Sequence, residues 1–312
     1  MIQPQENTKT IICIGTGGVG KTTLSASMAI GLASQGKKVL VLTIDPSQRL
    51  AQTLGIQTDG ELYQVPLGAN AHPKGQLWAS VINHKKSFDY FVESALNKTE
   101  KNASLNILNL QNNKLYQQLS GRLSGSQDFT SLVSLYRHVS SEKFDLVILD
   151  TPPSQHTWNF LQAPEKISAI FNDGIAKWFR EADTKKTGVL KKVFNLGTSQ
   201  VLKILENLTG SDFIKELSLF FKAVQNWQAP LENYIHNCHK LLTSSQTEFI
   251  LVTSLDPSRL LEAQKLIKEI RTQGYRLTTL IINQVPLWLS TEISTESARL
   301  KSLIKYYESL EN

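Results

Sequence analysis

The sequence predicts an α/β fold with a doubly wound, mostly parallel sheet and an inserted helical subdomain. Short, continuous apolar runs rich in β-branched residues recur along the chain, as expected of strands that are covered on both faces. Segments with helical periodicity, such as 260–272, separate these runs, and strands that alternate with helices are typical of this class. The expected strands are 11–14, 39–44, 146–149, 249–252 and 280–283, with a weaker one at 77–82.

The first expected strand leads into a glycine-rich loop and then into a helix. The loop matches G-x-x-x-x-G-K-[ST] in full, which predicts a P-loop NTPase core. Glycines let backbone N–H groups turn toward phosphate oxygens, and the dipole of the following helix favours the anion. Lys21 should reach the β- and γ-phosphates of ATP, and the Thr22 hydroxyl should bind Mg²⁺. The residues predicted to bind the nucleotide here are Gly15, Thr16, Gly17, Gly18, Val19, Gly20, Lys21, Thr22 and Thr23.

Two aspartates follow expected strands, at the edge of the sheet where ligands bind. Asp150 ends the run 146–149, and we expect it to hold Mg²⁺ through water as a Walker B residue rather than to cap a helix. Asp45 ends the run 39–44 and could orient the attacking water. Its alternative role is an N-cap before Pro46, and both roles can hold together.

Two further segments are open to more than one interpretation. The stretch 255–260 nearly repeats the sequence around Asp45, but we interpret it as a capped helix start with a proline. Any nucleotide contact there would come from the backbone near the base. His156 follows the Walker B aspartate and is either a sensor of the γ-phosphate or a surface residue.

The stretch 158–245 lacks strand alternation and is typical of several amphipathic helices. It divides the chain into a first core part at 1–157, a helical insertion for a client or effector at 158–245, and a last core part at 246–312. The aromatic stripes of the insertion either pack inward or form an exposed apolar groove for a client.

Composition excludes several classes of protein. The net charge of +6 arises from 33 basic and 27 acidic residues spread along the chain, so we expect no nucleic-acid partner. Two cysteines provide no disulfide framework and fit a reducing compartment. The N-terminus lacks an apolar signal core, and no apolar run approaches the ~20 residues that span a bilayer. We therefore expect a cytoplasmic location.

Taken in order, these motifs resemble the ArsA family of ATPases over nearly the whole chain. The resemblance rests on the loop at 15–23, Asp45-Pro46-Ser47 as switch I, the stretch 150–157 as switch II, and Asn283-Gln284 as an adenine-contacting pair. It implies that Asp45 positions the attacking water, that Thr22 binds Mg²⁺, and that Asn283 contacts adenine. Asp45 and Lys21 are thus the predicted catalytic residues, with Thr22 and Asp150 at the metal.

The sequence departs from the family pattern in places. Thr16 stands where the family has a lysine that reaches the nucleotide of the partner in dimers, and threonine cannot supply that charge. Arg49 could compensate, or it is an ordinary solvated helix residue. No C-x-x-C occurs, so we expect no zinc clip. Cys13 and Cys238 should lie too far apart to form a thiolate cluster, which disfavours arsenite binding.

The first functional hypothesis is a Mg²⁺-dependent ATPase whose nucleotide state controls binding of a protein or membrane-protein client by the helical subdomain. It would act as a homodimer or as a heterodimer with a related subunit. The alternative is a nucleotide-binding regulatory or scaffold protein with weak hydrolysis that pairs with a related subunit. A partitioning ATPase ranks third because such proteins usually lack a long helical insertion.

Overall fold

The computed structural model of the 312-residue chain describes residues 3–44, 49–96, 127–152, 160–161 and 228–285. Within this part, seven strands form one sheet in the order β3-β4-β2-β5-β1-β6-β7. All neighbouring strands are parallel except β3 and β4, which confirms the predicted fold class. The strands are β1 (Thr10–Gly15), β2 (Lys38–Thr43), β3 (Tyr63–Val65), β4 (Gln76–Val81), β5 (Leu146–Asp150), β6 (Thr247–Ser254) and β7 (Leu277–Asn283).

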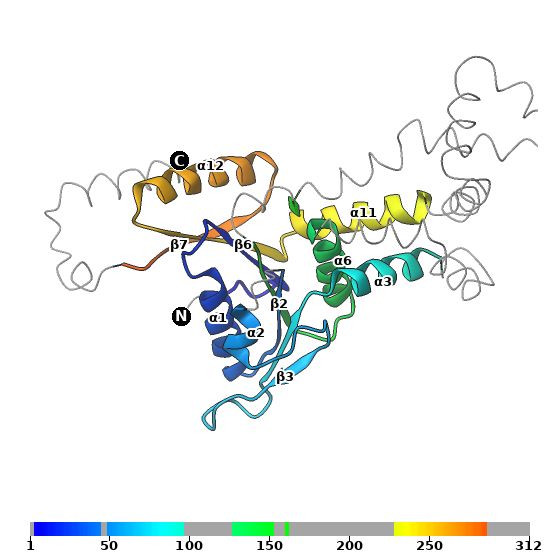
Figure 1. Ribbon diagram of the computed structural model, residues 1–312, viewed down its shortest axis with the longest axis horizontal. Coiled ribbons are helices and arrows are strands. Elements are labelled where there is room, and N and C mark those ends of the chain that lie inside the picture. The colour runs from blue at the N-terminus through cyan, green and yellow to red at the C-terminus, as the bar shows by residue number, and fades with distance from the viewer. Residues whose placement is uncertain (1–2, 45–48, 97–126, 153–159, 162–227, 286–312) are drawn as a thin grey trace, which may run out of the picture.

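Helices cover both faces of the sheet. Figure 1 shows α1 and α2 side by side, α12 on the other side of β6 and β7, and α3, α6 and α11 grouped together at the right. Residues of α6, α11 and α12 share one apolar core, and residues of α1 and α2 share the other. The helices are α1 (Lys21–Ser34), α2 (Arg49–Leu54), α3 (His84–Leu96), α6 (Gln127–Ser140), α11 (Gln228–Thr243) and α12 (Pro257–Thr272).

The central strand β1 shows why its sequence is apolar without interruption. Successive side chains of a strand point to opposite faces. Ile11 and Cys13 therefore pack in the core beneath α1, while Ile12 and Ile14 pack in the core beneath α6, α11 and α12. All four side chains are fully buried. Burial of each isoleucine contributes about 1.5–3 kcal/mol, so both faces of β1 stabilise the fold.

All six expected strands are present, and most of them extend by one or more residues beyond the apolar run. The helix expected at 260–272 begins earlier, at Pro257. Its N-cap is Asp256, whose carboxylate accepts hydrogen bonds from the backbone N–H of Ser258 at 2.9 Å and of Arg259 at 3.2 Å. The interpretation of this segment as a capped helix start is therefore confirmed. Sequence reasoning missed β3, a three-residue edge strand.

Most of the predicted helical insertion, 158–245, lies outside the described residues, and the proposed domain boundaries stay predictions. Its final helix, α11, packs against α3 and α6, which precede β5 and were not foreseen as partners. The ring of Tyr234 lies 5.2 Å from that of Phe91 and 5.0 Å from that of Tyr136, centroid to centroid. The hydroxyl of Tyr234 donates to the carbonyl of Val133 at 3.1 Å. Tyr234 therefore packs inward, while the aromatic stripes predicted for the insertion lie outside the described residues.

Candidate nucleotide site

The predicted site residues that the structure describes lie at or near the carboxyl ends of β1, β5 and β7. Strand β1 lies between β5 and β6, both of which come much later in the chain. Ligands of doubly wound sheets bind outside the carboxyl ends, where the connections diverge. The glycine-rich loop leaves β1 at this point and enters α1 at Lys21.

Close contacts with β6 and β7 explain two glycines of the loop. A Cβ atom on Gly15 would lie 2.0 Å from the carbonyl oxygen of Val252, and one on Gly20 would lie 2.5 Å from Nδ2 of Asn283. Both glycines also have positive φ angles, 148° and 88°. A larger residue at Gly15 would require the backbone of β6 to move, and a larger residue at Gly20 would require the Asn283 side chain to move.

The start of α1 leaves its backbone donors available to an anion. Gly20 is the N-cap, in the left-handed conformation, and makes no side-chain capping hydrogen bond. The first turn of α1 contains no acidic residue. Helix α12, in contrast, is capped by Asp256. The first N–H groups of a helix need partners, and a phosphate is a suitable partner for those of α1.

Lys21 lies across the beginning of the loop. Its Nζ donates to the carbonyl oxygens of Gly15 at 3.0 Å and Thr16 at 2.8 Å, and the residue is 7 % exposed. These bonds hold the ammonium group inside the loop, close to the uncapped N-terminus of α1. The arrangement concentrates positive charge where phosphates are expected.

Thr22 and Asp150 are brought together as the motif predicted. The Thr22 hydroxyl donates to Oδ2 of Asp150 at 2.8 Å, and the Thr43 hydroxyl at the end of β2 approaches the same oxygen at 3.2 Å. Asp150 is fully buried. The described residues contain no group of three or more His, Cys, Asp or Glu side chains that could hold a metal. A hydroxyl beside one carboxylate suits Mg²⁺, which retains waters and binds substrate phosphates rather than an all-protein cage.

The Asn283-Gln284 pair holds the loop from the side of β7. Nδ2 of Asn283 donates to the carbonyl of Val19 at 2.8 Å, and Nε2 of Gln284 donates to the carbonyl of Gly18 at 2.9 Å. Gln284 adopts a positive φ of 58°, which is uncommon for a residue other than glycine. The expected contact of Asn283 with adenine stays a prediction.

Four predicted residues remain: Asp45, His156, Thr16 and Arg49. Asp45 and His156 lie outside the described residues. The Thr16 side chain is 1 % exposed, and its hydroxyl makes no hydrogen bond within the described part of the chain. Arg49 is exposed at the start of α2.

Sequence reasoning missed Arg259, in the first turn of α12. A Cβ atom placed on Gly18 would lie 3.6 Å and 3.9 Å from the two terminal guanidinium nitrogens of Arg259. The side chain therefore reaches the glycine-rich loop. The near repeat of the Asp45 segment at 255–260 could have indicated this contact, but we expected the segment to contact the nucleotide only through its backbone.

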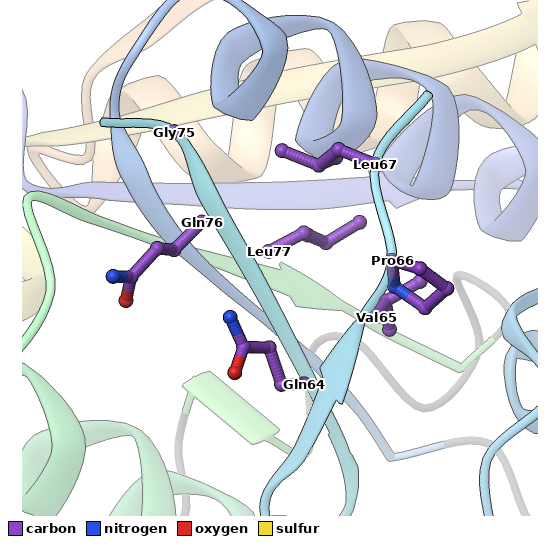
Figure 2. A pocket seen from close by; sticks show the side chains of 7 residues that line it. All are labelled: Gln64, Val65, Pro66, Leu67, Gly75, Gln76 and Leu77. Atoms are coloured by element: carbon purple, nitrogen blue, oxygen red, sulfur yellow. The ribbon is translucent and has the colours of Figure 1, made fainter. Parts of the chain in front are cut away.

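A cavity of about 350 Å³ lies beside β3 and β4, at the edge of the sheet opposite β7. Figure 2 shows the side chains that line it, which come from these two strands and the segments that flank them. None of these residues is charged: they are Gln64, Val65, Pro66, Leu67, Gly75, Gln76 and Leu77. Such a lining does not suit a triphosphate, which favours the loop as the nucleotide site.

Comparison with known proteins agrees with this geometry. The model of a family described as anion-transporting ATPase, ArsA, matches residues 8–311. The chain belongs to the ArsA ATPase family. Members of this family are ATP hydrolases, and the resemblance inferred from the motifs is thereby confirmed.

Several fungal relatives resemble this ArsA-family ATPase over most of their length. The protein named ATPase get3 of Schizosaccharomyces japonicus is 26% identical over 310 residues, which cover 98% of this chain and 84% of the relative. ATPase get3 of Aspergillus terreus is 25% identical over 309 residues, covering 98% and 82%. ATPase GET3 of Candida glabrata is 25% identical over 286 residues, covering 89% and 72%.

The two cysteines of the ArsA-family ATPase are both buried, Cys13 in β1 and Cys238 in α11. Burial raises the pKa of the Cys13 thiol to about 12 and raises that of Cys238 still further above its usual range. Neither thiol is therefore poised to act as a thiolate ligand. Among the described helices, none is long and apolar enough to cross a membrane.

Proposed function

We propose that this ArsA-family ATPase uses its nucleotide state to control the binding of a protein or membrane-protein client by its helical subdomain. The observation that carries the proposal is the burial of Phe160 and Leu161 against the helical layer, a short distance along the chain from Asp150. Phe160 is 0 % exposed and Leu161 is 4 % exposed.

The path from the site to these residues begins at the end of β5. The hydroxyl of Thr151, the residue after Asp150, donates to the carbonyl of Cys13 at 2.7 Å and so ties this strand end to β1. Farther along, Phe160 and Leu161 share a core with Leu132 of α6, and also with side chains of α11. A displacement that begins at Asp150 would therefore change how the side chains of α6 and α11 pack in this core. In nucleotide hydrolases, segments that become ordered or move with the nucleotide state commonly act as switches.

Different residues of the chain would have different roles in the hydrolysis of ATP. Lys21 and the uncapped N-terminus of α1 stabilise negative charge on the terminal phosphates. We assign Asp45 to the orientation of the attacking water. Thr22 and Asp150 would hold Mg²⁺, which supplies positive charge at the β- and γ-phosphates when bound.

Phosphate release by the purified chain tests the hydrolysis step. Substitution Asp45→Asn should lower the rate by about 10²–10⁴-fold, the usual contribution of a positioned carboxylate. Asp59→Asn is the matched control, because Asp59 lies in an exposed turn and its carboxylate contacts Tyr63 and Glu61 instead of the site. Equal rates for Asp45→Asn and the parent chain would contradict the role of Asp45.

Capture of a client tests the coupling. A single-span membrane segment of about 20 apolar residues, presented on a fluorescent carrier, should bind in a non-hydrolysable ATP analogue and dissociate in ADP. The control carrier has its apolar segment replaced by a polar one. Equal capture in both nucleotides would refute nucleotide control, and capture in neither would refute the client.

The buried, uncharged Thr16 favours keeping a second candidate, a nucleotide-binding scaffold that hydrolyses ATP weakly unless paired with a related subunit. Phosphate release distinguishes the two. Sustained turnover by the purified chain, abolished by Asp45→Asn, would rule out the scaffold. The mass of the ATP-bound chain in solution tests the homodimer that the first candidate includes.

A further inference from the structure

We propose that Arg259 binds the terminal phosphates of the nucleotide in the P-loop of the same chain. It would serve there as a second cation beside Lys21. The inference rests on nucleotide binding by the P-loop, as the proposed function does, but not on the existence of a client.

The backbone of Arg259 is held in one position. Its N–H donates to the Asp256 carboxylate at 3.2 Å, and its carbonyl accepts the hydroxyl of Thr253 at 3.2 Å. Thr253 belongs to β6, which pairs directly with β1. The first turn of α12 is therefore anchored to the strand beside the P-loop, and its third residue can reach the loop.

The guanidinium lies with both terminal nitrogens near Gly18, as the distances of 3.6 Å and 3.9 Å to a Cβ at that position show. Gly18 is exposed, with a positive φ of 72°, and Arg259 is half-buried. The loop thus has no side chain that separates the guanidinium from its backbone. A phosphate cradled by the loop would come within reach of this group.

The charge of Arg259 is not committed elsewhere in the described part of the chain, where it forms no ion pair. The nearest carboxylate in sequence, Asp256, already accepts hydrogen bonds from two backbone N–H groups and from the hydroxyl of Ser258. Asp256 is also exposed, so solvent screens its charge.

A guanidinium is suited to this position. Its planar fork of donors matches phosphate oxygens in pairs, and it stays protonated at any physiological pH. The loop itself contains one cationic residue, Lys21, whose ammonium also holds the carbonyls of Gly15 and Thr16. Position 16 is a neutral threonine. Arg259 would double the positive charge beside the phosphates.

The test measures ATP affinity of the full chain by titration, for the parent, Arg259→Gln and Arg259→Lys. Arg271→Gln is the matched control, because Arg271 is exposed in the last turn of the same helix. We expect Arg259→Gln to weaken ATP binding about tenfold, Arg259→Lys to recover part of the loss, and Arg271→Gln to leave it unchanged. The loss of ATP affinity should become smaller as the salt concentration is raised.

Binding stoichiometry counts folded molecules, so a lost fold is not mistaken for a lost contact. An ATP affinity of Arg259→Gln within twofold of the parent overturns the proposal. So does a variant that binds ATP normally but loses turnover only at high protein concentration, since Arg259 would then act on a second molecule. If the parent chain binds no ATP, nucleotide binding itself has failed, which is a separate result.

Discussion

The side-chain amide of Asn283 donates a hydrogen bond of 2.8 Å to the carbonyl oxygen of Val19, 264 residues earlier in the chain. The next residue, Gln284, donates to the carbonyl of Gly18 in the same way. Two consecutive carbonyls of the P-loop are therefore turned toward the end of β7. Because a peptide unit places its N–H opposite its carbonyl, the loop's donors are left to face the phosphates.

We predict that Asn283→Ala weakens ATP binding about tenfold, because the carbonyl of Val19 loses its donor and the loop loses its fixed orientation. If Asn283 also contacts adenine, the preference for ATP over GTP should narrow. Titration with both nucleotides measures this, with Asn83→Ala, whose side chain lies beside Gly60, as control. Unchanged ATP affinity would contradict the holding role.

Gly20→Ala should abolish detectable ATP binding. The new Cβ would lie 2.5 Å from Nδ2 of Asn283, on a backbone with φ of 88°. Gly274→Ala separates the two effects, because Gly274 has a φ of 76° but no atom within 4 Å of the added Cβ. We expect it to lower the free energy of unfolding by about 1–2 kcal/mol and to leave ATP affinity intact. Normal ATP binding by Gly20→Ala would show that the Asn283 side chain can move aside and that its contact with the loop is not needed.

Thiol labelling should distinguish the folded chain from the unfolded one. Cys13 is fully buried and Cys238 is 1 % exposed. Burial also raises the pKa of both thiols, to about 12 for Cys13. We expect an aromatic disulfide reagent at pH 8 to modify neither cysteine in the native protein and both in denaturant. Rapid labelling of one cysteine in the native protein would show that the strand or helix that contains it becomes exposed to solvent.

Acid should destabilise the fold through His138. Burial, with help from Arg137 and Lys143, lowers its pKa to about 4. The unfolded chain, with a pKa near 6.5, then binds the proton more tightly, so unfolding becomes easier as pH falls below about 6.5. Between pH 7.5 and 5 the loss from this group is about 2 kcal/mol.

Urea unfolding of His138→Gln at both pH values measures this contribution. The variant should show a smaller loss of stability on acidification, while His239→Gln, at an exposed position on α11, should behave as the parent. An equal loss in His138→Gln and the parent would assign the acid sensitivity to other groups.

The fold could be predicted because most strands of the sheet are covered on both faces and so have continuous apolar sequences. The same reasoning fails for β3, whose three residues at the sheet edge alternate between half-buried and exposed. Thr22 and Asp150 could be proposed from local motifs, and the structure brings their side chains together. Arg259 was not proposed, since its contact with Gly18 depends on β6 lying beside β1, and strand order is not apparent from chain order.

The pairing of β1 with β6 has a practical consequence for dissecting the protein. The carbonyl of Val252 closes one side of the P-loop at Gly15, and Asn283 closes another at Gly20. A fragment that stops before β6 would keep every residue of the glycine-rich loop at 15–23 and yet lose both of these contacts. A split of the chain into independently working halves would therefore have to leave β1, β6 and β7 in one piece.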